Sequence, residues 1–315
     1  MKHVAFVTYQ AHPALSASDA LVVEPLRARG VTVQAVTWDA AVDWRRFDSV
    51  VLRSNWDYQQ RPAEFRAWLV RLKRQRINPW NPADVVLWNI DKIYLRALQA
   101  NGVTIVPTVW LNHGQPANLA TLLSQQGWEQ AVVKPRIGAS ARHIWLTSNA
   151  EAPAHQCQLD ACLEQQAWMV QKLLPQIATG EWSLIFFRHE FAYAVLKKPE
   201  PGNIFVQQRL GGAWTHQQPV PSLIAQARYA LEVTQCLTGM QEPLLYARVD
   251  GIVIDGVLHL MELEVNEPGL MLDADAPRGP ERFAEAIVTV MDQTEQVIPR
   301  CWQKHSARPI PPGWQ

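Results

Sequence analysis

The first quarter of the chain alternates apolar runs of strand length with stretches of helical spacing. Residues 3–9 form an apolar run typical of a buried strand, and residues 18–29 repeat apolar positions at helical spacing. Residues 31–38 and 49–52 predict two further strands, and residues 62–75 predict an amphipathic helix. This order predicts an α/β lobe that opens with a β-α-β unit.

Beyond the proline-rich segment NPWNP the pattern changes, which marks a lobe boundary. A helix is expected over 92–100, a strand-turn-strand unit over 131–146, a strand over 168–174 and an amphipathic helix over 222–237. We therefore expect an α/β chain made of three α+β lobes. The predicted lobes are an N-terminal lobe (1–89), a central lobe (90–172) and a C-terminal lobe (173–315).

Acidic side chains interrupt the most β-like part of the chain, residues 246–270. Because side chains alternate along a strand, Glu262, Glu264 and Asn266 share one face at intervals of about 7 Å. Asp250 lies on the preceding apolar run. Burying carboxylates is unfavourable unless a cation neutralises them, so this face is predicted to hold a hard metal ion. The alternative is that the acids only solvate an exposed sheet face.

The turn between these two runs decides whether Asp250 joins the acidic face. In a two-residue turn Ile254 pairs with Val257, and Asp250 then faces away from the glutamates. A three-residue loop that ends with Gly256 in the left-handed conformation instead pairs Val253 with Val257. This register brings Asp250 to the glutamates, so we predict the three-residue loop.

Residues 131–146 combine a strand lysine with a turn of small residues. Lys134 supplies a point charge, and Gly138–Ala141 allows a polyanion to approach the backbone. Lys92, at the head of the predicted helix 92–100, is explained if it reaches a phosphate. The alternatives are a plain hairpin turn and a solvent-exposed lysine.

The strand over 168–174 ends in apolar residues that could line an adenine site, with Leu173 and Leu174 against the ring. The alternative is a plain crossing between lobes. Further on, Lys197 precedes a loop rich in Pro and Gly, which is the composition expected of a lid.

Ligands of open α/β sheets bind beyond the carboxyl ends of the strands. Six candidate substrate residues follow the first and third predicted strands: Tyr9, Arg53, Asn55, Trp56, Asp57 and Tyr58. A local surface ion pair between Arg53 and Asp57 is the alternative for those two. The lobe lacks GxGxxG, which disfavours a dinucleotide-binding fold of the usual kind.

Composition excludes several classes of protein. The chain has 29 basic and 29 acidic residues and no basic block, so no nucleic-acid partner is expected. No apolar run reaches the length of a membrane span and no signal peptide is recognisable, so we expect no membrane association and a cytoplasmic location. The four cysteines are read as simple thiols.

Taken together, these segments resemble the ATP-grasp superfamily of ligases. The resemblance covers nearly the whole chain and follows its order: Lys92 before a helix that ends in Gly-Val, then VVKP with a small-residue loop, QKLL, a Gly-rich loop, RVD and ELEVNEPG. The wording RSNWDY, GEWSL and KKPEPGN is most similar to the glutathione-synthetase-like subgroup that includes the D-cycloserine-forming ligase.

The resemblance implies a role for each candidate residue. ATP phosphates would be held by Lys92 and Lys134 and covered by Gly138, Ala139 and Ser140; the adenine would be framed by Gln171, Lys172, Leu173 and Leu174, with Glu181 near the ribose or base. Two Mg²⁺ ions would be held by Asp250, Glu264 and either Glu262 or Asn266. The candidate catalytic residues are Lys197 and Arg248, with Arg248 stabilising the transferring phosphoryl group.

The implied reaction joins a small amino-acid-like substrate to an amine, with release of ADP and phosphate. A carboxylate or ureido oxygen attacks the γ-phosphate of ATP, and the amine then takes the acyl group. A homodimer is possible. The alternatives are a kinase on the same fold, whose phosphorylated substrate is the product, and a protein that binds a nucleotide without turnover.

Two departures from the family pattern concern the metal and the substrate. The family usually has E-x-N, two residues, then PG. Here the candidates are Glu262-Leu-Glu264 and Glu264-Val-Asn266, and neither keeps that spacing to Pro268. Glu264 is the acid common to both alignments. The subgroup's lid usually reads GDFRVQ, whereas this chain has GNIFVQ, with Asn203 for the acid and Phe205 for the arginine. Arg209 is the candidate to replace the lost carboxylate contact.

Overall fold

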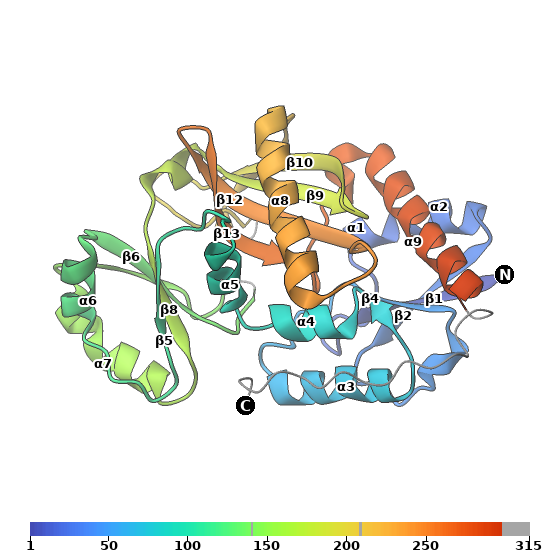
Figure 1. Cartoon of the computed structure of the whole chain (residues 1–315), viewed down its shortest axis with the longest axis horizontal. Helices are drawn as coiled ribbons and strands as arrows, with labels where there is room; N and C mark the ends of the chain where they lie inside the picture. The colour runs from blue at the N-terminus through green and yellow to red at the C-terminus, as the bar shows by residue number, and fades with distance from the viewer. Residues whose placement is uncertain (140, 208–209, 298–315) are drawn as a thin grey trace.

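The computed structural model describes residues 1–139, 141–207 and 210–297. Its strands form three sheets, with orders β2-β1-β3-β4, β5-β8-β6-β7 and β11-β10-β9-β12-β13 (Figure 1). The expected α/β fold class is confirmed. The lobe boundaries after residues 89 and 172 stay a prediction. None of the described helices is long and apolar enough to cross a membrane.

The first sheet is parallel and follows the predicted β-α-β order. Its elements are β1 (Lys2–Thr8), α1 (Ala17–Ala20), α2 (Val23–Ala28), β2 (Val31–Thr37), a 3-10 turn (Trp44–Arg46), β3 (Ser49–Leu52), α3 (Pro62–Arg74) and β4 (Pro79–Trp80). The helix expected over 18–29 is two short helices, because the nitrogens of Leu21 and Val22 donate to carbonyl oxygens three residues back, and Pro25 has no N–H to continue the helical pattern. Val22 is fully buried at this break, so packing rather than helical spacing places it.

The second sheet is antiparallel and has its own core. Its elements are β5 (Thr108–Leu111), α6 (Leu119–Gln126), β6 (Gln130–Pro135), β7 (Trp145–Ser148), α7 (Ala152–Leu163) and β8 (Trp168–Lys172). Apolar side chains of α6 and α7 cover one face of the sheet, where Leu123, Leu159 and Val133 are fully buried. The strand-turn-strand unit predicted over 131–146 is the β6–β7 pair.

The third sheet carries the acidic hairpin. Its elements are a 3-10 turn (Pro175–Thr179), β9 (Glu181–Phe187), β10 (Glu190–Lys198), β11 (Ala213–His216), α8 (Pro221–Thr238), β12 (Tyr246–Ile254), β13 (Val257–Glu264), a 3-10 turn (Leu272–Asp275) and α9 (Arg278–Val297). Helix α8 packs on β13, and α4 (Ala83–Asn89) and α5 (Tyr94–Ala100) pack on α8. Their apolar faces share one core with the sheet, so the chain after β4 is fixed against the hairpin.

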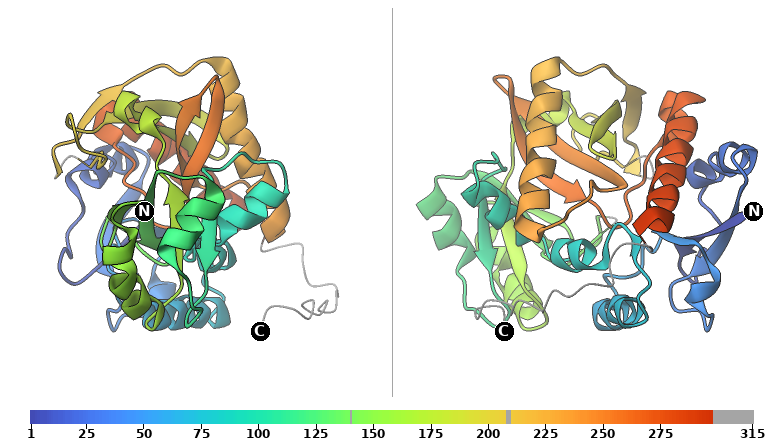
Figure 2. Two further views of the ribbon diagram at one scale, coloured as in Figure 1. Left: turned by 90° about the vertical axis from the view of Figure 1, so that its left-hand side faces the viewer. Right: turned by 45° about the vertical axis from the view of Figure 1, so that its right-hand side comes forward.

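Helix α9 packs on the first sheet although it ends the described chain. Figure 2 shows it beside the N-terminal helices. Phe283 of α9 lies in one core cluster with Phe6 of β1 and Phe187 of β9. Its ring stacks on Phe187 at a centroid distance of 5.1 Å and contacts Phe6 at 6.4 Å. The first and third sheets therefore share a core.

The side chain of Asn81 fixes the chain after β4 to the hairpin. Its amide nitrogen donates to the carbonyl oxygens of Tyr246 (2.8 Å) and Val265 (2.7 Å), and its amide oxygen accepts from the Leu245 nitrogen (2.7 Å). Asn81 is fully buried. These bonds fix the position of the start of β12 and the end of β13 relative to the N-terminal sheet.

The turn between β12 and β13 corrects the predicted register. It contains two residues, Asp255 and Gly256, both with positive φ (50° and 78°), and Ile254 pairs with Val257. The predicted three-residue loop is wrong. Two positive φ values match the twist of a two-residue hairpin, which Asp-Gly adopts readily.

A β-bulge inside the hairpin restores the common acidic face. Gly251 pairs with Leu260 whereas Asp250 pairs with Glu262, so Met261 is an extra residue in β13. Gly251 accommodates the bulge, because a Cβ atom there would lie 2.6 Å from the His259 carbonyl oxygen. Asp250 consequently faces the glutamates, by a shift at Met261 rather than at the turn.

Candidate active site

A cavity of about 290 Å³ lies where the second and third sheets and the loop after β3 meet. The predicted site residues that line it are Trp56, Tyr58, Lys92, Lys134, Gly138, Ala139, Gln171, Lys172, Leu173, Leu174, Glu181, Lys197, Arg248, Asp250, Glu262 and Glu264. Residues from all three sections of the chain are therefore brought to one place. The cavity has a charged end at the hairpin and an apolar end at β8 and the lid.

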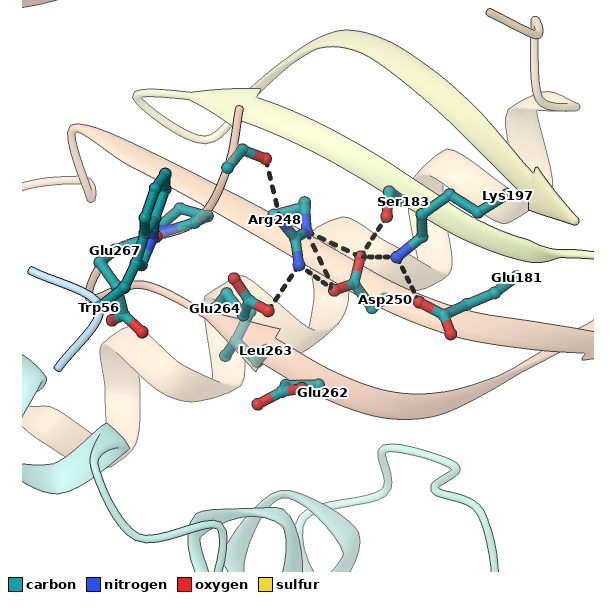
Figure 3. A network of polar contacts seen from close by, with 12 residues as sticks. Trp56, Glu181, Ser183, Lys197, Arg248, Asp250, Glu262, Leu263, Glu264 and Glu267 are labelled. Carbon is teal, nitrogen blue, oxygen red and sulfur yellow. Dashed lines mark hydrogen bonds and ion pairs between the residues drawn. The ribbon is translucent and has the colours of Figure 1, made fainter. Parts of the chain in front are cut away.

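Arg248 is the centre of the charged end. Its guanidinium donates to the Asp250 carboxylate (2.8–3.0 Å), to Glu264 (2.5 Å) and to the Gly269 carbonyl oxygen (2.8 Å). Burial disfavours its charge, but the carboxylates of Asp250 and Glu264 outweigh this effect and raise the pKa of Arg248. Arg248 is therefore a fixed cation on the acidic face (Figure 3).

A second buried cation lies on the other side of Asp250. Lys197 pairs with Glu181 and lies 3.7 Å from Asp250, and Ser183 donates a hydrogen bond to the same carboxylate (Figure 3). Burial raises the pKa of Asp250, but Arg248 and Lys197 together hold it below its usual value. Asp250 is thus ionised and held by three strands, β9, β10 and β12.

The two lysines predicted for phosphate lie on the opposite wall of the cavity. The Lys92 amine donates to the Gly138 carbonyl oxygen (2.5 Å) and lies 3.0 Å from the Glu262 carboxylate. Lys92 precedes α5, whose first residue is Tyr94, so the lysine is outside the helix rather than at its head. Lys134 is buried, and loss of hydration lowers the pKa of its amine to about 8.

The small-residue loop follows β6 directly. A Cβ atom at Gly138 would lie 2.8 Å from the Pro135 side chain, so glycine lets the loop fold back over β6. Ala141 and His143 have positive φ (51° and 58°), which turns the chain tightly at this point. Ser140 lies outside the described residues.

Glu264 and Glu267 have strongly perturbed carboxyl groups. Burial raises the pKa of Glu264 to about 7 and the pKa of Glu267 well above its usual range. Glu267 lines the cavity, and its carboxylate has no hydrogen-bond or ion-pair partner among the described residues. Glu267 was not predicted as a site residue, because strand alternation no longer applies after β13 ends at Glu264. The sequence feature that could have identified Glu267 is its position directly after Asn266, one of the predicted metal ligands.

Asn266 lies apart from the acids. It is buried outside the cavity lining, and its amide oxygen accepts a hydrogen bond from Asn55 at 3.2 Å. Its amide nitrogen is buried without a partner among the described residues. Asn55 and Asn266 thus join the first sheet to the end of the hairpin. The predicted metal ligands that line the cavity are Asp250, Glu262 and Glu264.

The apolar end of the cavity is closed by the lid. Leu173 and Leu174 pack in one cluster with Ile204 and Val206 of the lid and with Met261 of the bulge. The Gln171 amide donates to the Thr108 hydroxyl at 3.1 Å, which fixes β8 against β5. A flat apolar slot is thus formed next to the backbone of the residues predicted to frame adenine.

The candidate substrate residues of the N-terminal lobe separate into two sets. Trp56 and Tyr58 line the cavity, and the Trp56 indole donates to the Glu267 carbonyl oxygen at 3.0 Å. Arg53 is buried in an ion pair with Asp19 (2.9 Å), and Asp57 accepts from the Trp38 indole (2.7 Å). Arg53 and Asp57 therefore have structural partners, and neither forms the local surface ion pair considered as the alternative.

The remaining candidates lie at the edges of the site. Tyr9 lines a smaller cavity of about 280 Å³ that shares Trp56 with the main one. Asn203 caps its own turn, because its side chain accepts from the nitrogens of Ile204 and Phe205. Arg209 lies outside the described residues.

Apart from Glu267, the acids of the cavity are paired with cations rather than with one another. Within residues 1–139, 141–207 and 210–297, no group of three or more His, Cys, Asp or Glu side chains is close enough to hold an ion. Asp250 and Glu264 both contact Arg248, and Glu262 faces Lys92. Binding a metal ion would therefore require these carboxylates to exchange a cationic side chain for the ion.

Comparison with known proteins identifies relatives of this chain. Residues 4–81 match the family model described as the N-terminal domain of D-cycloserine synthetase DcsG. The cycloserine biosynthesis protein DcsG of Streptomyces lavendulae is 29% identical over 283 residues, which cover 84% of this chain and 91% of the relative.

Solved structures extend the likeness to the whole fold. D-cycloserine synthetase DcsG matches with a TM-score of 0.81 and 26% identity, covering 92% of this chain and 99% of the other. D-alanine–D-alanine ligase from Bacillus anthracis matches at 0.66 with 14% identity, covering 94% and 99%. The ATP-grasp ligase PsnB matches at 0.62 with 15% identity, covering 91% and 99%. The resemblance drawn from the sequence is confirmed: over most of its length the chain is similar to D-cycloserine synthetase DcsG, and it shares its fold with ATP-grasp ligases.

Proposed function

We propose that this chain is an ATP- and Mg²⁺-dependent ligase that activates a carboxylate, or a ureido oxygen, of a small amino-acid-like substrate and joins it to an amine. One observation carries the proposal. A single cavity brings an apolar slot, two lysines beside a small-residue loop and an acidic face with a fixed arginine together. These are the parts that phosphoryl transfer from ATP requires.

The nucleotide would lie along the cavity from its apolar to its charged end. Leu173 and Leu174, with the lid, would enclose the adenine, and Glu181 would approach the ribose. Lys92 and Lys134 would bind the phosphates, since both reach the cavity beside Gly138 and Ala139. A bound polyphosphate would also supply the buried Lys134 amine with the negative charge that it lacks.

The donor set on the acidic face suits Mg²⁺, which prefers carboxylate oxygens and keeps several waters. Glu267 is buried and Glu264 is half-buried, and burial raises the pKa of both carboxyl groups, so a bound cation would favour their ionised forms. We assign the ions, two by analogy with the family, to Asp250, Glu264 and Glu262, and add Glu267. Bound Mg²⁺ would polarise the phosphates and neutralise the charge that develops on them.

The reaction has two steps. A carboxylate oxygen of the substrate attacks the γ-phosphorus, the bond from that phosphorus to the bridging oxygen breaks, and ADP leaves. The amine then attacks the acyl carbon, phosphate leaves, and the nitrogen gives up a proton. Arg248 would stabilise the transferring phosphoryl group, because its guanidinium is fixed on the acidic face. The lid would exclude water from the acyl phosphate.

The proposal is tested by incubating the protein with ATP, Mg²⁺ and a panel of amino acids and small amines. We expect ADP release that depends on both a carboxylate and an amine, and a new amide in the mass spectrum. Phosphorylated substrate without amide would instead establish the kinase alternative. Nucleotide binding without ADP release for any pair would establish a binding protein.

A further inference from the structure

Arg142 lies at the mouth of the main cavity, on the loop between β6 and β7. Its backbone nitrogen donates to the Ala139 carbonyl oxygen (3.3 Å), and the residues on both sides, Ala141 and His143, have positive φ. The side chain lines the cavity and is exposed. Within the described parts of the chain, its guanidinium makes no hydrogen bond and no ion pair with another side chain.

The other cations of the cavity are already assigned. Lys92, Lys197 and Arg248 each face a carboxylate, and Lys134 is buried at the phosphate end. Lys172 is next to Leu173 at the apolar end. Among the described residues of the lining, Arg142 is therefore a guanidinium that faces no carboxylate partner and is available to a ligand.

The charge of Arg142 reaches the N-terminal lobe. Burial and the Asp57 carboxylate raise the pKa of the Tyr9 phenol, and Arg142 opposes this rise. Tyr9 meets the Trp56 ring edge-on at a centroid distance of 6.5 Å. Trp56 itself is fixed by its hydrogen bond to the Glu267 carbonyl oxygen. The guanidinium and an aromatic wall thus flank the space beside the acidic face.

A smaller cavity opens behind this wall. Its lining includes Tyr9, His12, Ser54 and Trp56, and Trp56 also lines the main cavity. Ser54 is only 1% exposed, and its hydroxyl has no partner among the described residues. A buried hydroxyl without a partner is unfavourable, so a polar ligand atom in this cavity would satisfy it.

The described part of the lid offers no cation to this region. It contributes Ile204, Phe205, Val206 and Gln207 to the lining, and Phe205 stands where the related lid motif has an arginine. An α-amino acid that supplies the amine in this reaction keeps a charged α-carboxylate, because its nitrogen is the reacting group. A guanidinium is the side chain best suited to hold it, through two parallel hydrogen bonds.

We propose that Arg142 binds the α-carboxylate of an α-amino acid that supplies the amine, between the phosphate loop and the Trp56–Tyr9 wall, with the side chain of that amino acid directed to the Ser54 cavity. This inference rests on the proposed function and names its substrate class, an α-amino acid with a free carboxylate. Arg142 then selects the substrate, while Arg248 serves the phosphoryl group.

Binding measurements test the inference without turnover. The full chain, saturated with Mg²⁺ and AMP-PNP, is titrated calorimetrically with small D- and L-amino acids and with their carboxamides. We expect at least one amino acid to bind about tenfold or more tightly than its carboxamide. Arg142→Gln should abolish that preference by weakening the acid alone, and Arg142→Lys should restore part of it. Arg71→Gln, an exposed change on α3, should leave the preference intact.

Three outcomes overturn the inference. The first is that the unchanged protein binds acid and carboxamide equally, or binds neither. The second is that Arg142→Gln keeps the preference for the acid. The third is that Arg142→Gln keeps this preference and loses affinity for AMP-PNP. The last outcome would place Arg142 on the nucleotide. An intact Arg142-dependent preference without amide formation would remove the ligase proposal and leave the carboxylate site standing.

Discussion

At the scale of single residues, we expect Lys134, a proposed phosphate ligand, to make nucleotide binding sensitive to pH. Burial lowers the pKa of its amine to about 8, so its charge is present below pH 8 and is lost above it. Because phosphates bind the charged form, we expect ATP affinity to fall as the pH rises through 8, towards about tenfold per pH unit. Calorimetric titration with ATP at a series of pH values measures this slope.

Lys134→Arg is the matched control. A guanidinium stays protonated throughout this range, so the affinity of the variant should change little between pH 7 and 9. An equally steep fall in the arginine variant would assign the pH dependence to another group.

We expect the Glu264 carboxylate to lower the stability of the folded protein while it supports turnover. Burial raises the pKa of its carboxyl group to about 7, so the folded state holds a proton that the unfolded state loses at lower pH. Its contribution to stability therefore declines as the pH rises from the unfolded value towards 7, and the full penalty persists above 7. Glu264→Gln should raise the free energy of unfolding at pH 8 by about 1 kcal/mol. Urea denaturation measures it.

The same variant should lose at least about 100-fold in turnover, because it removes the carboxylate that contacts Arg248 and that we propose to bind Mg²⁺. ADP release at saturating ATP measures the loss. A stable protein with undiminished turnover would remove Glu264 from the metal site.

At the scale of elements, the bulge in β13 determines the acidic face. A methyl group at Gly251 would lie 2.6 Å from the His259 carbonyl oxygen and 2.7 Å from the Leu258 side chain. We expect Gly251→Ala to lower the free energy of unfolding by about 1–3 kcal/mol and to reduce turnover, since the strands must separate at the bulge. Gly256→Asn is the control, because asparagine tolerates positive φ in the turn. Equal stabilities of the two variants would show that the bulge tolerates a side chain.

The hairpin also shows what a sequence can and cannot predict. Alternation correctly predicted that Glu262 and Glu264 share a face, because that depends only on strand geometry. The position of the bulge was not predictable, because it depends on packing of Gly251 against another strand. The turn was misassigned for the same reason: one extra residue can lie anywhere between Asp250 and Glu262 with the same effect on the face.

Contacts between side chains that are distant in the sequence could not be predicted either. Arg53 follows β3 and was a candidate for substrate binding. It instead forms a buried ion pair with Asp19, which no local sequence pattern indicates. Lys92, Lys134 and Arg248 were recognisable because lysines and arginines in apolar contexts need a charged partner. Arg142 had no such signal, since an exposed arginine on a loop is ordinary.

At the scale of the whole molecule, Asn81 connects the N-terminal sheet to the hairpin. Its three hydrogen bonds are buried and join the chain after β4 to both β12 and β13. We expect Asn81→Ala to lower the free energy of unfolding by about 3 kcal/mol or more, because two carbonyl oxygens and one nitrogen lose their partner. Asn101→Ala, on the exposed end of α5, should cost less than about 1 kcal/mol. Similar losses for both would mean that water replaces Asn81.

Helix α9 sets the order in which this protein can fold during synthesis. The first sheet leaves the ribosome first, yet its core includes Phe283 and neighbouring side chains of the last helix. Domains made in sequence usually fold from the N-terminus. Here the core of the N-terminal lobe is completed only after α9 has been synthesised. Ribosome-bound chains that stop before residue 278 are therefore expected to remain protease-sensitive within β1–β3, and longer chains to become resistant. Early resistance of that segment would show that it folds without α9.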